Sequence, residues 1–338
     1  MILAELDPAV TARLFSPSAA FAHPATLPMV AGIGAALVVA TVIIEVLGRT
    51  GKVTREHLAE LRKRTLSWWI LAPLMLVPVL LGAATSILAV LVLSIFAYRE
   101  YARATGLFRE LFVSAIVVLG LIAVNLAALD NWYGLFVALF PITIALLAAL
   151  PILQDQPKGY IQRVGLAVLG FSFFGMCFGH LSYFANDTHF RPAIIFLLIT
   201  VELNDVFAYC TGKLFGRRKL APNTSPKKTL GGALGALILT TSLTAWLAHF
   251  IFRGTAIDHP LHLAALGLLI SIGGQFGDLV MSSIKRDIGI KDLGVLIPGH
   301  GGILDRFDSL ILVAPLVFHF VRFFCGADPA QAVRIFSH

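Results

Sequence analysis

Charged residues and cysteines are scarce in this sequence. Only 13% of its 338 residues are Asp, Glu, Lys or Arg, whereas a soluble domain averages about 25%. That scarcity argues against a large soluble core. The three cysteines, Cys177, Cys210 and Cys325, form no CxxC pair and lie in or beside apolar segments. We therefore expect neither a disulfide framework nor a zinc site.

The N-terminus lacks the basic residues of a signal peptide. It begins MILAELDPAV, with acidic residues where a basic region would stand, so we expect no signal peptide. The net charge is +7, which in a soluble protein could indicate nucleic acid. Here the basic residues separate apolar segments, so membrane orientation is the simpler cause and no nucleic-acid partner is expected.

Long apolar runs dominate the chain. Hydrophobic residues make up 58% of it, and the mean hydropathy is +0.86. Such composition predicts an all-α, polytopic integral membrane protein, because a lipid-exposed backbone must satisfy its own hydrogen bonds. About ten transmembrane helices are expected, at residues 28–48, 67–82, 84–98, 111–129, 132–152, 163–186, 192–212, 230–252, 263–283 and 307–325.

The distribution of basic residues predicts the orientation. If both termini lie outside, 21 of the 26 Lys and Arg residues fall in cytoplasmic loops, as the positive-inside rule requires. Loop 49–66 is basic and is followed by Trp68 and Trp69, a pattern that predicts an amphipathic helix on the cytoplasmic face with Trp anchors at the interface. It is either an orientation anchor or an attractor of anionic lipid. We expect an N-terminal membrane region, 1–190, with about six helices, and a C-terminal catalytic region, 191–338.

The first polar region is VELNDVFAYCTGKLFGRRKLAPNTSPKKTLGG, residues 201–232. Glu202 and Asp205 lie inside an apolar segment, where a carboxylate is costly and therefore a functional candidate. The loop that follows combines lysines, hydroxyls and a glycine-rich helix start. It is either a polyphosphate cradle or a positive-inside anchor. The cradle residues would be Ser225, Lys227, Lys228 and Thr229.

The second polar region covers residues 273–310. Gly273 and Gly277 form a small-xxx-small face, which favours close helix packing beside Asp278. Asp305 and Asp308 lie at the start of the last apolar segment, where they are either functional or complements of the helix dipole. Carboxylates without a Cys or His cluster suit Mg²⁺, and Lys and Arg suit phosphate oxygens. Together they indicate phosphoryl or nucleotidyl transfer to a lipid.

These residues carry a family resemblance. SSIKRDIGIKDLGVLIPGHGGILDRFD, residues 282–308, resembles the C-terminal signature of the phosphatidate cytidylyltransferases (CDP-diacylglycerol synthases). The upstream block, from Asp205 to Thr229, is also similar to that family, through DVFAY and SPKKT. The resemblance covers about residues 200–325. Over residues 1–190 it rests only on a polytopic helical pattern.

The resemblance implies a reaction in which CTP and phosphatidate give CDP-diacylglycerol and pyrophosphate. It implies Mg²⁺ on Asp278 and Asp305, with Asp205 near the metal and room for a second cation. The catalytic residues would be Asp278, Asp305, Lys285, Arg286 and Asp308. Residues expected to bind the nucleotide are Ser225, Lys227, Lys228, Thr229, Lys291, Asp292, His300, Gly301, Gly302 and Arg306. His300 could also be a loop histidine without a role.

The expected location is the cytoplasmic (inner) membrane of a bacterium, with the active site facing the cytoplasm. One position departs from the family: Gly231 stands where many members have Glu. A cytidylyltransferase for another lipid phosphate, such as an isoprenoid or ether lipid, is therefore an alternative. A secondary transporter with intramembrane acids is a second alternative. The sequence leaves open whether the protein is a homodimer.

Overall fold

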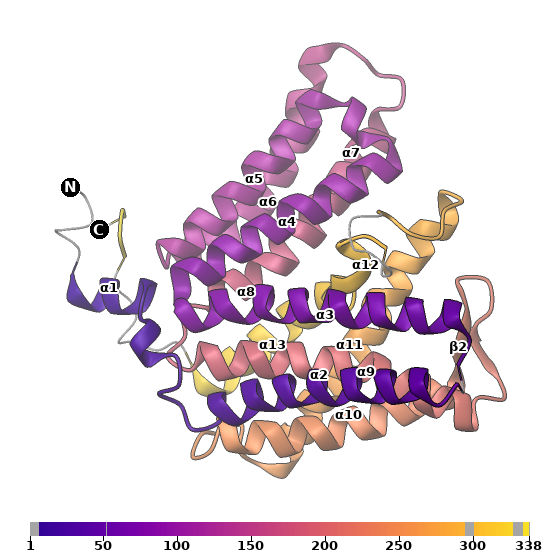
Figure 1. Cartoon of the computed structure of the whole chain (residues 1–338). Helices are drawn as coiled ribbons and strands as arrows, with labels where there is room; N and C mark the ends of the chain where they lie inside the picture. The colour runs from indigo at the N-terminus through magenta and orange to yellow at the C-terminus, as the bar shows by residue number, and fades with distance from the viewer. Residues whose placement is uncertain (1–6, 52, 295–300, 327–333, 338) are drawn as a thin grey trace.

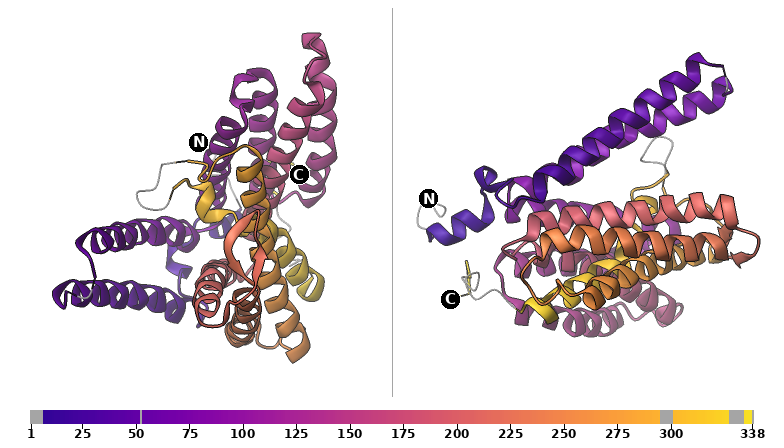
Figure 2. Two further views of the ribbon diagram at one scale, coloured as in Figure 1. Left: turned by 90° about the vertical axis from the view of Figure 1, so that its right-hand side faces the viewer. Right: turned by 90° about the horizontal axis from the view of Figure 1, so that it is seen from below.

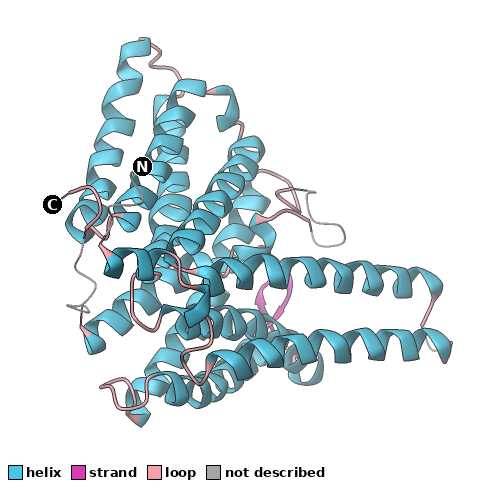
Figure 3. Cartoon of the chain, turned by 60° about the vertical axis from the view of Figure 1, so that its left-hand side comes forward, coloured by secondary structure: helices cyan, strands magenta, loops and turns pink. Residues whose placement is uncertain are grey.

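The computed structural model describes residues 7–51, 53–294, 301–326 and 334–337. Almost all of this part of the chain is helical, apart from one β-hairpin (Figure 3). The helices are α1 (Pro8–Leu14), α2 (Thr26–Arg49), α3 (Arg55–Leu81), α4 (Ala83–Thr105), α5 (Leu111–Leu129), α6 (Tyr133–Ala149), α7 (Tyr160–Gly170), α8 (Phe178–Phe184), α9 (Phe190–Phe215), α10 (Leu230–Ile251), α11 (Pro260–Asp287), α12 (Leu304–Phe307) and α13 (Leu310–Cys325). The strands are β1 (Lys219–Ala221) and β2 (Ser225–Thr229). Short 3₁₀ turns occupy Pro17–Ala19, Leu107–Arg109 and Leu150–Gln154, and a π-helical stretch, Phe171–Cys177, joins α7 to α8.

Each of the ten predicted apolar segments coincides with helical structure. Among the described residues, nine helices are long and apolar enough to cross a membrane, and α13 is a shorter apolar helix. The chain is therefore an integral membrane protein. The orientation with both termini outside stays a prediction.

Two local features differ from the expectations. The described chain is nearly all-α, as predicted, but it also contains β1 and β2, which pair antiparallel with Lys219 opposite Thr229. The basic stretch 49–66 is helical from Arg55, as predicted, but it is not a separate element, because α3 continues into the apolar span. Thr54 caps this helix, and its hydroxyl accepts a hydrogen bond from the amide of His57 at 3.4 Å.

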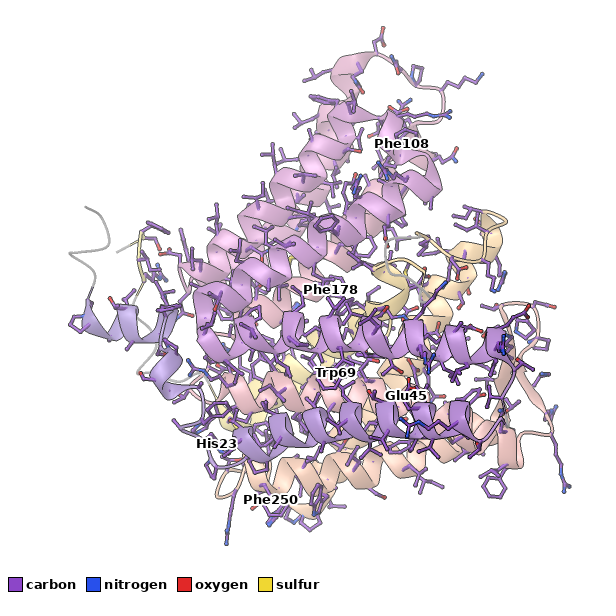
Figure 4. The ribbon with its side chains drawn as sticks, in the orientation of Figure 1. His23, Glu45, Trp69, Phe108, Phe178 and Phe250 are labelled. Atoms are coloured by element: carbon purple, nitrogen blue, oxygen red, sulfur yellow. The ribbon has the colours of Figure 1, made fainter. Side chains whose placement is uncertain are left out.

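The helices form three groups (Figure 1). Helices α4 to α8 form one bundle, and α9, α10, α11 and α13 form another below it in that view. The α2–α3 pair leans away from the second bundle, as Figure 2 shows. Glu45 and Trp69 join the two helices of this pair (Figure 4). Arg62 Nη2 lies 2.6 Å from Glu45 Oε2, and Trp69 Nε1 donates to Thr41 Oγ1 at 3.1 Å.

Small and polar residues hold the second bundle together. Asn204 Oδ1 on α9 accepts hydrogen bonds from Thr240 Oγ1 at 2.9 Å and Ser271 Oγ at 2.7 Å, so it joins α9 to α10 and α11. A Cβ on Gly277 would lie 2.6 Å from the carbonyl oxygen of Asp308. The predicted close packing at the glycine face of α11 is thereby confirmed, with the start of the last helix as its partner.

Candidate active site

The β-hairpin brings its basic residues to the ends of α9 and α10 (Figure 1). Thr229 both ends β2 and caps α10, accepting a hydrogen bond from the amide of Gly232 at 3.1 Å. Side chains alternate along a strand, so neighbouring lysines point to opposite faces. Lys227 is exposed, whereas the Lys228 side chain is only 19% exposed. The hairpin therefore directs one of the two lysines into the protein.

Lys228 reaches Asp278 on α11. Its Nζ lies 2.5 Å from Asp278 Oδ2. The other carboxylate oxygen, Oδ1, accepts a hydrogen bond from Ser282 Oγ at 3.2 Å. Because both side chains are largely shielded, water screens this pair less than it would a surface pair. Two site residues predicted from the sequence, one from β2 and one from α11, thus meet.

Asp305 forms a second centre with Lys285. Lys285 Nζ donates to Asp305 Oδ1 at 2.8 Å, and the two side chains are 10% and 6% exposed. Asp305 Oδ2 accepts two backbone hydrogen bonds, from Leu293 at 3.1 Å and Gly302 at 3.0 Å. Asp305 therefore also organises the chain on both sides of residues 295–300.

Asp205 and Asp308 lie close to Asp278, and Asp308 also interacts electrostatically with Lys285. Both carboxylates interact electrostatically with Asp278 and with each other. Ser309 joins them, because its hydroxyl contacts Asp205 Oδ2 at 3.5 Å and its amide donates to Asp308 Oδ1 at 2.8 Å. Asp308 is buried, whereas Asp205 is accessible. The structure thus gathers the predicted acids from three elements.

Arg306 adds a further positive charge to this cluster. Its guanidinium interacts electrostatically with Glu202 and Asp205 on α9. The two acids that the sequence placed inside an apolar segment therefore have a basic neighbour. A compensating charge of this kind lowers the cost of carboxylates at membrane depth.

The other predicted site residues lie around the rim. Arg286 is exposed, and its Nε donates to the carbonyl of Thr224 at 3.3 Å, joining α11 to the hairpin. Lys291 and Asp292 are exposed. Gly301 has φ of +86°, a value that favours glycine. His300, for which a nucleotide contact was predicted, lies outside the described residues.

The donor chemistry suits a hard cation, because carboxylate oxygens are the ligands that Mg²⁺ prefers. In this structure, however, lysine ammonium groups lie against Asp278 and Asp305. Among the described residues, no three His, Cys, Asp or Glu side chains are already arranged to hold a metal ion. A cation bound to these carboxylates would take the place of a lysine charge.

Glu100 on α4 lies close to the site but was not among the residues predicted from the sequence. This side chain is 5% exposed, and its carboxylate accepts hydrogen bonds from the amides of Ile303 at 3.0 Å and Leu304 at 2.9 Å. Those residues immediately precede Asp305. The signal available in the sequence was an acid near the end of an apolar segment, flanked by arginines at 99 and 103.

An apolar cavity of about 480 Å³ adjoins the polar cluster. Residues from α3, α4, α8 and α9 form most of its lining. Ile303, Phe307 and Leu310 complete it, and they alternate in the chain with Asp305 and Asp308. A polar, charged site and an apolar cavity thus share one short segment.

This combination of a multi-helix membrane protein with paired lysines and acids defines a membrane-embedded polar site suited to phosphate groups. The family model described as "Cytidylyltransferase family" matches residues 62–324. The chain belongs to the cytidylyltransferase family, as its C-terminal motif indicated.

Bacterial relatives support this assignment. The chain is 40% identical to "Uncharacterized protein YnbB" of Escherichia coli (strain K12) over 203 residues, which are 58% of this chain and 66% of that protein. It is 34% identical to the phosphatidate cytidylyltransferase of Bacillus subtilis (strain 168) over 221 residues, 63% of this chain and 80% of that protein. The phosphatidate cytidylyltransferase of Staphylococcus saprophyticus is 47% identical over 124 residues, 37% of this chain and 46% of that protein. The chain thus spans slightly less than two thirds of the E. coli relative and about half of the staphylococcal one.

Proposed function

We propose that the protein transfers CMP from CTP to phosphatidate, giving CDP-diacylglycerol and pyrophosphate. The observation that carries this proposal is the cluster of Lys228, Lys285, Asp278, Asp305 and Asp308 next to an apolar cavity. A lipid with a phosphate headgroup needs both kinds of surface. The family membership and the names of the Bacillus and Staphylococcus relatives support the same substrates.

In the proposed reaction, a phosphate oxygen of phosphatidate attacks the α-phosphorus of CTP. The bond from that phosphorus to the oxygen bridging to the β-phosphate breaks, and pyrophosphate leaves with the bonding electrons. The nucleophile is already an anion, so no strong general base is required. The main barrier is repulsion between two anions, which positive charges at fixed positions lower.

Each charged group has a proposed task. Lys228, Lys285 and Arg306 would bind phosphate oxygens, together with Lys227 and Arg286 at the rim. Asp278 and Asp305, together with Asp205, would hold Mg²⁺. Asp308 would add a further negative charge beside Asp278 and Lys285. The cation would neutralise phosphate charge and stabilise the leaving pyrophosphate. A lysine that no longer paired with its carboxylate would be free to bind a phosphate oxygen.

The exposed basic residues of the hairpin support a site that opens on the cytoplasmic face of a bacterial inner membrane. CTP is water-soluble and would enter from that side. Ser225, Thr229, Lys291, Asp292, His300, Gly301 and Gly302 would contribute nucleotide contacts. Under this proposal the apolar cavity would accommodate part of the lipid.

The test uses purified full-length protein in detergent, with phosphatidate, Mg²⁺ and CTP labelled in the α-phosphate. Label should enter the lipid phase and stay in water when a chelator removes Mg²⁺. A parallel arm replaces phosphatidate with a polyprenyl phosphate. Label transfer only in that arm would overturn phosphatidate as the substrate. Lack of transfer in both arms would overturn the proposed reaction.

A further inference from the structure

Glu100 is a buried acid that the proposed reaction does not use. It lies on α4 in the N-terminal half of the chain, is 5% exposed and has buried Ala97 and Tyr101 as neighbours on the helix. No Lys, Arg or His pairs with it among the residues that the structure describes. Burying a carboxylate is costly unless its charge is satisfied, so its actual partners are informative.

Those partners are backbone amides at the start of α12. Ile303 donates to Glu100 Oε1 at 3.0 Å, and Leu304 donates to Oε2 at 2.9 Å. Each carboxylate oxygen thus accepts one amide. A carboxylate can do this with both oxygens, whereas a glutamine has only one acceptor oxygen. The arrangement therefore suits a carboxylate, with an acceptor on each side, better than an amide side chain.

Two glycines enclose the same carboxylate. A Cβ on Gly294 would lie 2.4 Å from Glu100 Oε1, and a Cβ on Gly302 would lie 2.4 Å from Oε2. Any larger residue would displace the acid or the backbone. The chain therefore approaches Glu100 closely from both sides of residues 295–300.

Asp305 also binds the backbone near the two glycines. Its Oδ2 accepts hydrogen bonds from the amides of Leu293 and Gly302. Leu293 directly precedes Gly294, and Gly302 directly precedes Ile303. A shift of the segment away from α4 would therefore move Asp305 relative to Lys285. Catalysis by fixed charges is sensitive to displacements of about 1 Å.

We propose that Glu100 is a positioning residue: through the amides of Ile303 and Leu304 it holds the segment that carries Asp305 in register with Lys285. It does not touch the substrates. The proposal deepens the proposed function and rests on it. It also gives the N-terminal membrane region a task in the chemistry of the C-terminal one.

The experiment compares Glu100→Gln and Glu100→Asp with wild type, as full-length protein in detergent. The control is Glu110→Gln, which removes a half-buried acid paired with Arg163 at 3.8 Å and away from the site. Measurements are kcat and KM for both substrates, the melting temperature, and amide exchange of the peptide covering residues 301–306.

We expect Glu100→Gln to lower kcat about 10- to 100-fold, since one charge-assisted hydrogen bond is lost and the other weakened. Both KM values should stay within about twofold, because substrate contacts are intact. Exchange in residues 301–306 should be about tenfold faster or more. Glu100→Asp should recover part of kcat, and Glu110→Gln should match wild type in kcat, in both KM values and in the exchange of residues 301–306.

A second pair of variants tests the arrangement from the loop side. Gly294→Ala should lower kcat in the wild-type background and have a smaller effect in Glu100→Ala, because the acid is then absent and only the contact with Gly302 Cα at 3.1 Å remains. Gly165→Ala is the control, since its Cβ would meet no atom within 4 Å. Additive effects of Gly294→Ala and Glu100→Ala would overturn the proposal.

Other outcomes also decide the matter. Wild-type kcat and exchange in Glu100→Gln would overturn the positioning role. So would an equal loss in Glu110→Gln, or a lower melting temperature with unchanged kcat per folded molecule. If wild-type protein transfers no CMP, the proposed function fails, and amide exchange alone still tests whether Glu100 holds the segment.

Discussion

Lys228 Nζ lies 2.5 Å from Asp278 Oδ2, which ties the β-hairpin to the transmembrane helix α11. Lys285 and Asp305 repeat the arrangement at 2.8 Å. Each of these carboxylates thus has a lysine partner, and removing one member would leave the other as an uncompensated charge in a shielded place.

Asp278→Asn should lower kcat for CMP transfer about 100-fold or more, because it keeps the shape of the side chain and removes the charge expected to hold both Lys228 and the cation. Label transfer to phosphatidate is the measurement. Asp258→Asn is the matched control, since Asp258 also pairs with a basic side chain, His249, at 2.6 Å in the loop before α11. Equal losses in the two variants would contradict the assigned site.

The two lysines of β2 should differ in effect. Lys228→Gln should lower kcat about 10- to 100-fold, because it removes one partner of a shielded charge pair. Lys227→Gln should instead raise KM for CTP a few-fold, and less at high salt, since an exposed charge acts through screened attraction. Steady-state kinetics at two salt concentrations measure both effects. The reverse order of kcat losses would show that the strand presents its other face to the site.

Gly231 is a steric position in this chain. A Cβ there would lie 2.6 Å from the carbonyl oxygen of Phe215 and 2.8 Å from its carbon. Gly231→Ala and Gly231→Glu should each destabilise the protein by about 1–3 kcal/mol, because backbone must move to make room. Gly165→Ala should leave the melting temperature unchanged or raise it, since alanine favours a helix and has space there. An unaffected melting temperature in Gly231→Glu would show that the contact relaxes freely.

The C-terminal residues bind Asp130, which lies just after α5. Its Oδ1 accepts the amides of Ile335 at 2.7 Å and Phe336 at 2.6 Å, and Oδ2 accepts the hydroxyl of Ser337. Burial acts to raise the pKa of Asp130, but these hydrogen bonds outweigh it and hold the pKa below its ordinary value of 3.8.

The sign of the pH effect follows from this lowered pKa. The carboxylate stabilises the folded state fully above pH 3.8, and that stabilisation is lost as the pH falls below 3.8 through the folded-state pKa. Asp130→Asn should therefore cost about 1 kcal/mol at pH 7, and the difference from wild type should shrink below pH 4. Melting temperatures measure this. Asp155→Asn is the control, an exposed acid with φ of 49° that Asn also tolerates. A constant difference at all pH values would contradict the account.

Much of the fold could be predicted because membrane helices require continuous apolar runs. The helical character of the basic stretch 49–66 could also be predicted, since REHLAELRKR is rich in Glu, Leu, Arg and Lys, which all favour helix. Its continuity with the next apolar run could not, because the basic residues suggested a separate cytoplasmic loop. The hairpin was missed because its strands are short and two prolines, Pro222 and Pro226, argued against β-structure.

The acidic residues of the site could be predicted because they lie in recognisable motifs. Asp205, Asp278, Asp305 and Asp308 were chosen as acids at membrane depth or at its edge, and the structure gathers them with Lys228 and Lys285. The partners of Glu100 were not predictable, because they lie 203 and 204 residues further along the chain. Neither local pattern nor helical period reveals a contact between the two membrane regions.

The interleaving of Ile303, Phe307 and Leu310 with Asp305 and Asp308 has a geometric consequence. The chain from Ile303 to Leu310 sets where the apolar cavity meets the charged cluster, because its residues contribute to both. Successive residues of a helix are only about 1.5 Å apart along its axis. A lipid bound across this boundary would therefore have its headgroup placed at the level of the carboxylates by the protein itself.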